Sequence, residues 1–152
     1  MKTASEVLCA LQGRTLVTAE SLTGGGIGAL LTAVPGASKV YKGGIISYTD
    51  EVKREALGVP AAYLSSFGAV SAPVAEAMAV GARMYLKADV AVSVTGLAGP
   101  DGDAFGNPVG TVFIGYADAH GSKAGEYHFS GDREAVRNQT IAAALEMILQ
   151  NQ

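Results

Sequence analysis

Five consecutive residues, Val90 to Val94, form a nearly unbroken apolar segment with high strand propensity. A strand without polar alternation is typical of the centre of a sheet that is covered on both faces. Segments with helical spacing precede this strand. In one of them, the apolar residues Ile27, Leu30, Leu31 and Val34 are spaced by three and four residues. The sequence therefore predicts an α/β fold, a three-layer α/β/α sandwich.

Predicted strands and helices alternate along most of the chain. The strands are expected at 15–18, 43–48, 90–94, 109–117 and 124–129, and the helices at 4–12, 22–33, 50–57, 72–85 and from 133 onward. Residues 118–122 are a connection short enough for a hairpin, so the last two strands are expected to be antiparallel. The sheet is thus predicted to be mixed and mostly parallel, with a C-terminal antiparallel hairpin. No repeat or linker divides the chain, and a single domain is expected over residues 1–152.

Composition and charge disfavour several classes of partner. The formal net charge is −3 and no basic cluster occurs, which argues against direct nucleic-acid binding. No apolar stretch reaches the roughly 20 residues needed to cross a membrane, and the early polar residues do not suit a signal peptide, so a cytoplasmic location is expected. The apolar fraction of 49% is compatible with a homo-oligomer. Cys9, the single cysteine, lies in an apolar helical pattern and is expected to be buried and inert.

The segment from Thr18 to Gly25 reads Thr-Ala-Glu-Ser-Leu-Thr-Gly-Gly and places Ser21 between a predicted strand and a predicted helix. A serine there can be a nucleophile, a ligand for an anion, or a helix cap. Glycines lower helix stability by up to about 1 kcal/mol each relative to alanine, so Gly24 to Gly26 need another explanation. Free backbone N–H groups beside them suit a phosphate or a developing oxyanion.

A serine nucleophile needs a base. His120 and His128 fall in the predicted hairpin, where exposed histidines are the better interpretation. Lys53 lies one turn into the helix that follows Tyr48, and it must be neutral, hence partly buried, to accept a proton. The alternative for Lys53 is an ordinary exposed helix lysine. Tyr48 could pack in the core or direct its hydroxyl into a pocket, where it could orient the amine or relay a proton.

The segment from Thr95 to Gly102 is too rich in glycine for a simple connection and suits backbone shaped around a ligand, beginning at Thr95 and Gly96. Asp101 and Asp103 follow, but two carboxylates without a histidine are weak support for a metal. No metal and no cofactor are expected.

Five motifs taken together resemble the CinA C-terminal domain family. They are Thr-Ala-Glu-Ser-Leu-Thr-Gly-Gly at 18–25, Gly-Ala-Val-Ser at 68–71, Ser-Val-Thr-Gly-Leu-Ala-Gly-Pro at 93–100, Pro-Val-Gly-Thr-Val at 108–112 and Phe-Ser-Gly-Asp-Arg at 129–133. The resemblance covers nearly the whole chain. Longer members carry an additional N-terminal domain similar to molybdopterin-binding proteins, and 152 residues leave no room for it, so the chain resembles the stand-alone nicotinamide-nucleotide amidases of the family.

This resemblance implies a serine amidohydrolase that deamidates nicotinamide mononucleotide to nicotinate mononucleotide and ammonia. It implies Ser21 as nucleophile, Lys53 as base and Tyr48 beside them. The implied oxyanion donors are backbone N–H groups near Gly24 and Gly25 or in the Thr95–Gly96 loop. The candidates for holding the substrate phosphate are Arg133 and the backbone of Thr23, Gly24 and Gly25.

Two other interpretations stay open. A non-catalytic, regulatory module could use the same glycine-rich segments to bind a pyridine nucleotide without turnover, but such a module would not need Lys53. An accessory protein of competence or recombination that acts on DNA is suggested by the family's name alone, and the acidic charge balance disfavours direct DNA contact.

Overall fold

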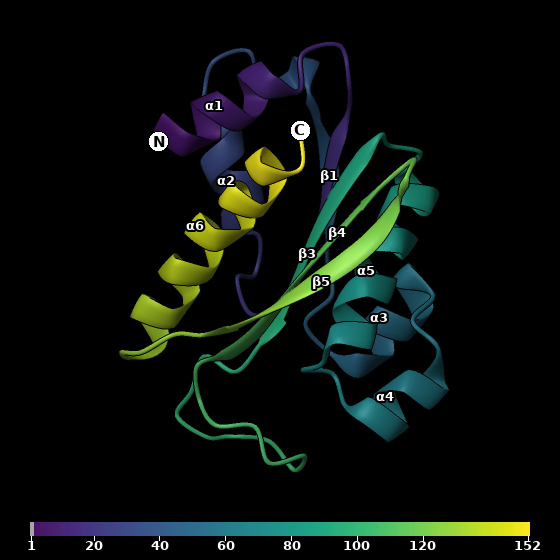
Figure 1. Cartoon of the computed structure of the whole chain (residues 1–152), viewed down its shortest axis with the longest axis vertical. Coiled ribbons are helices and arrows are strands. Elements are labelled where there is room, and N and C mark those ends of the chain that lie inside the picture. The colour runs from purple at the N-terminus through teal and green to yellow at the C-terminus, as the bar shows by residue number, and fades with distance from the viewer. Residues whose placement is uncertain (1) are drawn as a thin grey trace.

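A computed structural model describes residues 2–152 and shows one five-stranded sheet with helices on both faces (Figure 1). The strand order is β2-β1-β3-β4-β5. The strands are β1 (Leu16–Glu20), β2 (Tyr41–Ile46), β3 (Val90–Gly96), β4 (Thr111–Asp118) and β5 (Gly121–His128). β1 pairs in parallel with both β2 and β3, whereas β3–β4 and β4–β5 are antiparallel. The predicted mixed α/β/α architecture is confirmed.

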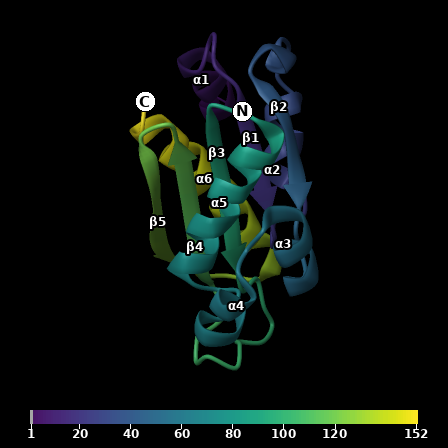
Figure 2. The ribbon, with the colours of Figure 1, turned by 90° about the vertical axis from the view of Figure 1, so that its right-hand side faces the viewer.

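The helices divide between the two faces of the sheet, as the two views at right angles show (Figure 2). Their bounds are α1 (Lys2–Ala10), α2 (Gly26–Thr32), α3 (Asp50–Leu57), α4 (Ala61–Phe67), α5 (Ala72–Leu86) and α6 (Arg133–Gln150), with a short 3₁₀ helix, η1 (Ala37–Lys39). One apolar cluster joins α1, α2 and α6 to the sheet, and another joins α3 and α5 to the opposite face. β3 lies between them, and Val90 to Val94 are fully buried, as its apolar pattern predicts.

Several predicted boundaries differ from the structure. The helix expected from residue 22 begins at Gly26, because residues 22–25 form a turn in which two glycines take positive φ angles. The hairpin connection is two residues, Ala119 and His120, rather than five. The helix α4 is not predicted from the sequence. None of its residues is buried, so its sequence lacks the apolar stripe that indicates a helix. Cys9 is exposed, and the expectation of a buried thiol was wrong because it lies on the outer face of α1.

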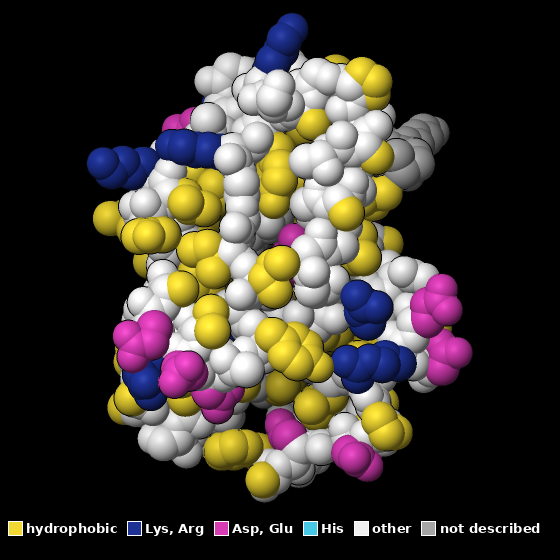
Figure 3. All heavy atoms as spheres, turned by 180° about the vertical axis from the view of Figure 1, so that it is seen from behind, with side chains coloured by type: hydrophobic (Ala, Val, Ile, Leu, Met, Phe, Trp, Pro, Cys, Tyr) yellow, Lys and Arg dark blue, Asp and Glu magenta, His cyan; other side chains and the backbone are white. Residues whose placement is uncertain are grey.

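Charged side chains are dispersed on one face of the protein. On the face seen in Figure 3, basic and acidic side chains lie in separate small groups among polar and apolar atoms, with no continuous basic area. Within residues 2–152, no helix combines the length and apolar character needed to span a bilayer.

Close contact between α5 and α3 depends on Gly81. A Cβ atom at this position would collide with the carbonyl oxygen of Leu57, the last residue of α3. The obstacle is backbone, which cannot turn away as a side chain can. A side chain at position 81 must therefore push the two helices apart. These helices carry Lys53 and part of the apolar cluster beneath it.

We expect Gly81→Ala to destabilise the protein by about 1–3 kcal/mol, since overpacking outweighs the helix propensity gained by alanine. Chemical denaturation of the purified protein measures this change. Met84→Ala is the matched control on the same helix, because Met84 is 65% exposed, and it should alter stability by less than about 0.5 kcal/mol. An unchanged or raised unfolding free energy for Gly81→Ala would show that α3 and α5 can separate freely.

Candidate active site

A cavity of about 280 Å³ opens where β1 and β3 end, at the edge of the sheet where ligands gather in α/β folds. It is bordered by five segments distant in sequence: the turn after β1, the segment joining β2 to α3, the connection before α5, the loop after β3, and the first residue of α6. The residues with polar side chains that line it are Ser21, Tyr48, Asp50, Lys53, Thr95, Asp101 and Arg133. The fold thus brings together most of the site residues predicted from the sequence.

Ser21 and Lys53 form the centre of this cavity. The Lys53 Nζ atom lies 3.0 Å from the Ser21 Oγ atom. The same Nζ lies 2.9 Å from the carbonyl oxygen of Ser47 and 3.4 Å from that of Tyr48. Lys53 is only 2% exposed and Ser21 6%. The lysine is therefore a buried amine held against a buried hydroxyl, and the alternative of an ordinary exposed helix lysine is wrong.

Burial lowers the pKa of the Lys53 amine below its ordinary value, and the nearby Asp50 carboxylate partly opposes this shift. Desolvation disfavours the charged form, because an ammonium loses its hydration in the interior. The three atoms near Nζ are oxygens that can accept its hydrogen bonds, and of these the Ser21 hydroxyl alone can also donate to a neutral amine. Burial thus makes the neutral amine, the form that can accept a proton, easier to reach than for a lysine in water.

The backbone around Ser21 is fixed by the Glu20 carboxylate, which is 2% exposed. Its oxygens accept hydrogen bonds from the amides of Ile27 (2.8 Å) and Gly28 (3.1 Å) in the first turn of α2. They also accept from the hydroxyls of Thr23 (2.6 Å) and Thr18 (3.2 Å). Glu20 therefore caps α2. Ser21 lies five residues before that helix and does not cap it, which corrects the cap interpretation.

Thr23, Gly24 and Gly25 do not line the cavity, in contrast to their predicted role as substrate ligands. The Thr23 hydroxyl is occupied by Glu20, and the Gly24 amide donates to the Ser21 carbonyl oxygen at 3.1 Å. Gly24 and Gly25 have φ angles of 58° and 104°, a region that glycine adopts without strain. These glycines serve the tight turn between β1 and α2.

Tyr48 and Arg133 meet at the mouth of the cavity. The Arg133 Nη2 atom donates to the Tyr48 hydroxyl at 3.1 Å, and Nη1 donates to the Gly99 carbonyl oxygen at 2.6 Å. Tyr48 is 58% exposed, so it is not a core residue. Its hydroxyl contacts Arg133 and not Lys53, whereas its backbone carbonyl faces the amine. Within residues 2–152, Arg133 has no carboxylate partner.

Thr95 and Gly96 border the cavity at the end of β3, but both also have structural tasks. The Thr95 hydroxyl donates to the Ala69 carbonyl oxygen at 2.8 Å, which ties β3 to the segment before α5. A Cβ on Gly96 would press against Val112 and the Thr111 backbone at 2.7 and 2.9 Å. Asp103 hydrogen-bonds within its own loop, and no group of three metal-ligating side chains occurs in the described part of the chain.

Sequence reasoning did not identify two residues that shape this site, Glu20 and Arg137. Glu20 was noted only as part of a motif, although an acidic residue between an apolar strand and a glycine-rich turn is a signal for a helix-capping carboxylate. Arg137 donates from Nε to the Leu22 carbonyl oxygen at 2.9 Å and from Nη2 to that of Thr23 at 3.2 Å. The sequence feature that could have identified Arg137 is its spacing of four residues from Arg133, which places both arginines on one face of α6.

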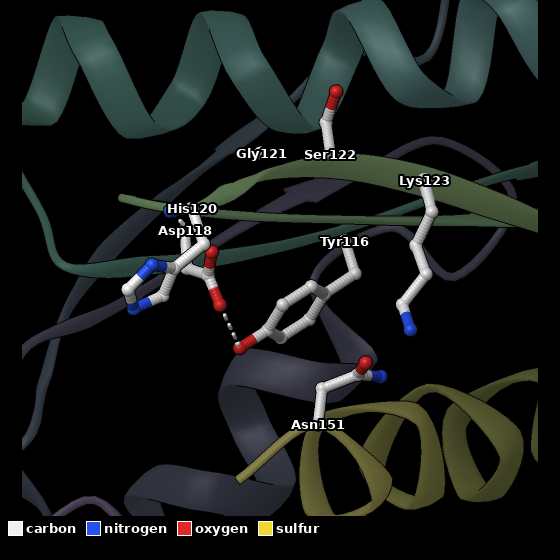
Figure 4. Close-up of a pocket in the computed structure, with 7 residues that line it drawn as sticks. All are labelled: Tyr116, Asp118, His120, Gly121, Ser122, Lys123 and Asn151. Carbon is white, nitrogen blue, oxygen red and sulfur yellow. Dashed lines mark hydrogen bonds between the residues drawn. The ribbon is translucent and has the colours of Figure 1, made fainter.

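A second cavity, of about 260 Å³, lies at the hairpin end of the sheet (Figure 4). Tyr116 directs its hydroxyl to Asp118 at 3.0 Å, and Asn151 closes the cavity from the end of α6. His120 lies at this end too, and both it and His128 are exposed, as the sequence predicted. No pairing of a serine with a buried base occurs among the seven residues that line it.

Comparison with known proteins agrees with this architecture. The crystal structure of competence damage-inducible protein A (ComA) from Klebsiella pneumoniae superposes with a TM-score of 0.95 at 34% identity, over 98% of this chain and 94% of that one. Competence/damage inducible protein CihA from Agrobacterium tumefaciens gives 0.95 at 38% identity, over 99% and 94%.

Among curated relatives, a CinA-like protein of Geobacter metallireducens is 47% identical over 136 residues, which is 90% of this chain and 33% of that protein. The chain thus spans about a third of the curated relatives it matches. The model of the CinA C-terminal domain matches residues 1–152, and with these similarities it shows that the chain belongs to the CinA C-terminal domain family.

Proposed function

We propose that this chain is a serine amidohydrolase that deamidates nicotinamide mononucleotide. The observation that carries the proposal is the 3.0 Å contact between the buried Lys53 Nζ and the buried Ser21 Oγ in an open cavity. An amine whose pKa is lowered by burial can serve as a general base beside a serine. The proposal treats residues 1–152 as one catalytic domain that needs no metal or cofactor.

The proposed reaction begins with a neutral Lys53, whose N–H groups donate to the Ser47 and Tyr48 carbonyl oxygens while its lone pair accepts the Ser21 hydroxyl proton. The Ser21 oxygen then attacks the carboxamide carbon. The Lys53 ammonium returns the proton to the departing nitrogen, and ammonia leaves an ester between Ser21 and the nicotinate group. Water, deprotonated by Lys53, hydrolyses this ester and gives nicotinate mononucleotide and free Ser21.

In this proposal the cavity holds the pyridine carboxamide and the rest of the nucleotide lies outside. Its volume of about 280 Å³ lies near the lower limit of ~300–1,000 Å³ typical of pockets for larger ligands. The exposed ring of Tyr48 borders the entrance, and Arg133, which has no carboxylate partner in the described part of the chain, adds a positive charge there. A guanidinium with unused N–H donors suits the 5′-phosphate.

Ser21→Ala should abolish ammonia release from nicotinamide mononucleotide, with a rate loss on the order of 10⁶, as for removal of a serine nucleophile elsewhere. Lys53→Arg should be comparably inactive, since a guanidinium stays protonated. A coupled ammonia assay measures both. Ser66→Ala, which alters an exposed serine on α4, is the control and should retain full activity. Nucleotide binding without ammonia from the unaltered protein would instead support the regulatory binding module.

The pH dependence should report the lowered pKa of Lys53. Activity needs the neutral amine, so kcat/KM should rise with pH and level off at a pH below the usual lysine value of 10.5. Asp50→Asn removes the carboxylate that raises the Lys53 pKa, so the rising limb should move to lower pH. A pH series on both proteins measures the shift. A limb that stays in place, or moves to higher pH, would exclude Lys53 as the titrating base.

Arg133→Gln should raise KM for nicotinamide mononucleotide by about 10-fold or more, because a charged phosphate contact is lost. Nicotinamide riboside, which has no phosphate, is the control substrate, and its kinetic constants should change little. Equal losses with both substrates would assign Arg133 to holding Tyr48 and the Gly99 loop instead of the phosphate.

A further inference from the structure

We infer that Arg137 is a positioning residue that holds the oxyanion-binding amide of the Ser21 turn in its working orientation. The inference rests on the proposed hydrolytic role of Ser21. It starts from the two hydrogen bonds that Arg137 donates from α6 to the carbonyl oxygens of Leu22 and Thr23. Arg137 does not line the cavity, so these contacts are its link to the site.

Leu22 supplies the amide in question. Within residues 2–152, the Leu22 N–H has no hydrogen-bond acceptor, and Leu22 borders the cavity next to Ser21. The preceding Ser21 carbonyl oxygen accepts from the Gly24 amide inside the turn. In a planar trans peptide the N–H points opposite to the C=O. The Leu22 N–H is thus directed away from the turn interior, on the nucleophile's own peptide, where an oxyanion donor is needed.

Three linked peptide groups connect Arg137 to this amide. The guanidinium holds the Thr23 carbonyl, whose peptide also contains the Gly24 N–H. That N–H donates to the Ser21 carbonyl at 3.1 Å, whose peptide contains the Leu22 N–H. A second guanidinium contact fixes the Leu22 carbonyl at 2.9 Å. A rotation of the Thr23–Gly24 peptide would break both Arg137's contact and the bond that orients the Leu22 amide.

Rotation of the Thr23–Gly24 peptide must be prevented by specific contacts, because the glycines at positions 24 and 25 restrict the backbone little. Gly24 and Gly25 both have positive φ angles and, without a Cβ, can adopt the alternatives that a peptide flip requires. The Thr23 carbonyl oxygen also accepts from the Gly26 amide at 3.0 Å, so Arg137 is a second restraint on that peptide. Within residues 2–152, Arg137 is the one hydrogen-bond donor to the Leu22 carbonyl oxygen. The Leu22 and Thr23 carbonyl oxygens accept from two N–H groups of the planar Arg137 guanidinium. A lysine ammonium does not reproduce this geometry.

The test compares Arg137→Met with Arg83→Met. Both remove a guanidinium that donates to a backbone carbonyl, but Arg83 contacts Asp89, which precedes β3, whereas Ser21 pairs with Val94 near the other end of that strand. An alkyl fluorophosphonate serves as the probe. The Ser21 oxygen bonds to phosphorus, fluoride leaves, Lys53 takes the proton, and the phosphoryl oxygen occupies the oxyanion position. Intact-mass spectrometry with peptide mapping gives the rate of labelling at Ser21.

Arg137→Met should slow labelling by about 10²-fold, as for the loss of one oxyanion donor, and Arg83→Met should leave the rate unchanged. The Leu22 and Thr23 amide resonances should shift in ¹⁵N-correlated spectra of Arg137→Met and of Arg137→Lys, which keeps the charge and guards against an unfolded variant. For any substrate turned over, kcat should fall with little change in KM. The inference would be overturned if either folded Arg137 variant were labelled at Ser21 as fast as the unaltered protein and its Leu22 and Thr23 amide resonances did not shift. It would also be overturned if the probe did not label the unaltered protein at Ser21.

The proposed substrate can fail separately. If the unaltered protein is labelled at Ser21 and labelling depends on Arg137, but nicotinamide mononucleotide yields no ammonia, then the positioning role stands and the substrate assignment is wrong.

Discussion

The buried Glu20 carboxylate is the interaction on which the local structure around the site depends. An ionised carboxylate in the interior is strongly unfavourable unless hydrogen bonds replace its hydration. Glu20 receives four, two of them from amides in the first turn of α2. These bonds fasten the end of β1 to the start of α2, six residues further along the chain. The intervening residues, Ser21 to Gly25, are left with little freedom except to form a tight turn.

That turn determines how the Ser21 hydroxyl meets the Lys53 amine. Ser21 is held on one side by the backbone bond from its amide to Val94 on β3, at 3.1 Å. Lys53 arrives from α3, whose position against α5 requires Gly81. The amine and hydroxyl therefore come from different elements, α3 and the turn after β1, and their 3.0 Å contact is a product of sheet and helix packing. Burial that lowers the Lys53 pKa follows from the same packing.

Arg133 and Arg137 lie one helical turn apart on α6 and contact different parts of the site. Arg133, at the exposed start, reaches the entrance through Tyr48 and Gly99. Arg137, half-buried, reaches the backbone of the Ser21 turn. Their spacing of four residues places them on one face, so a single helix borders both the entrance and the rear of the site. The α6 helix begins where it does because Asp132 accepts from the Ala135 amide at 2.9 Å.

Local signals in the sequence determined much of the framework. The apolar run Val90 to Val94 predicted a central strand, and the helix predicted at 50–57 is observed as α3. The Thr49 hydroxyl caps this helix by accepting from the Val52 amide at 3.3 Å. The motif around Ser21, with Lys53 and Tyr48, identified candidates for the chemistry. These features depend on neighbours within a few residues, and such interactions are readable from a chain alone.

Only the tertiary structure decided which candidates meet. It buried Lys53 against Ser21, turned the Tyr48 hydroxyl toward Arg133, and placed Gly24 and Gly25 within the turn but outside the cavity lining. It also brought Arg137 to residues more than a hundred positions earlier. The physical reason is that burial, desolvation and contacts between distant segments arise from packing of whole elements, which no local pattern encodes.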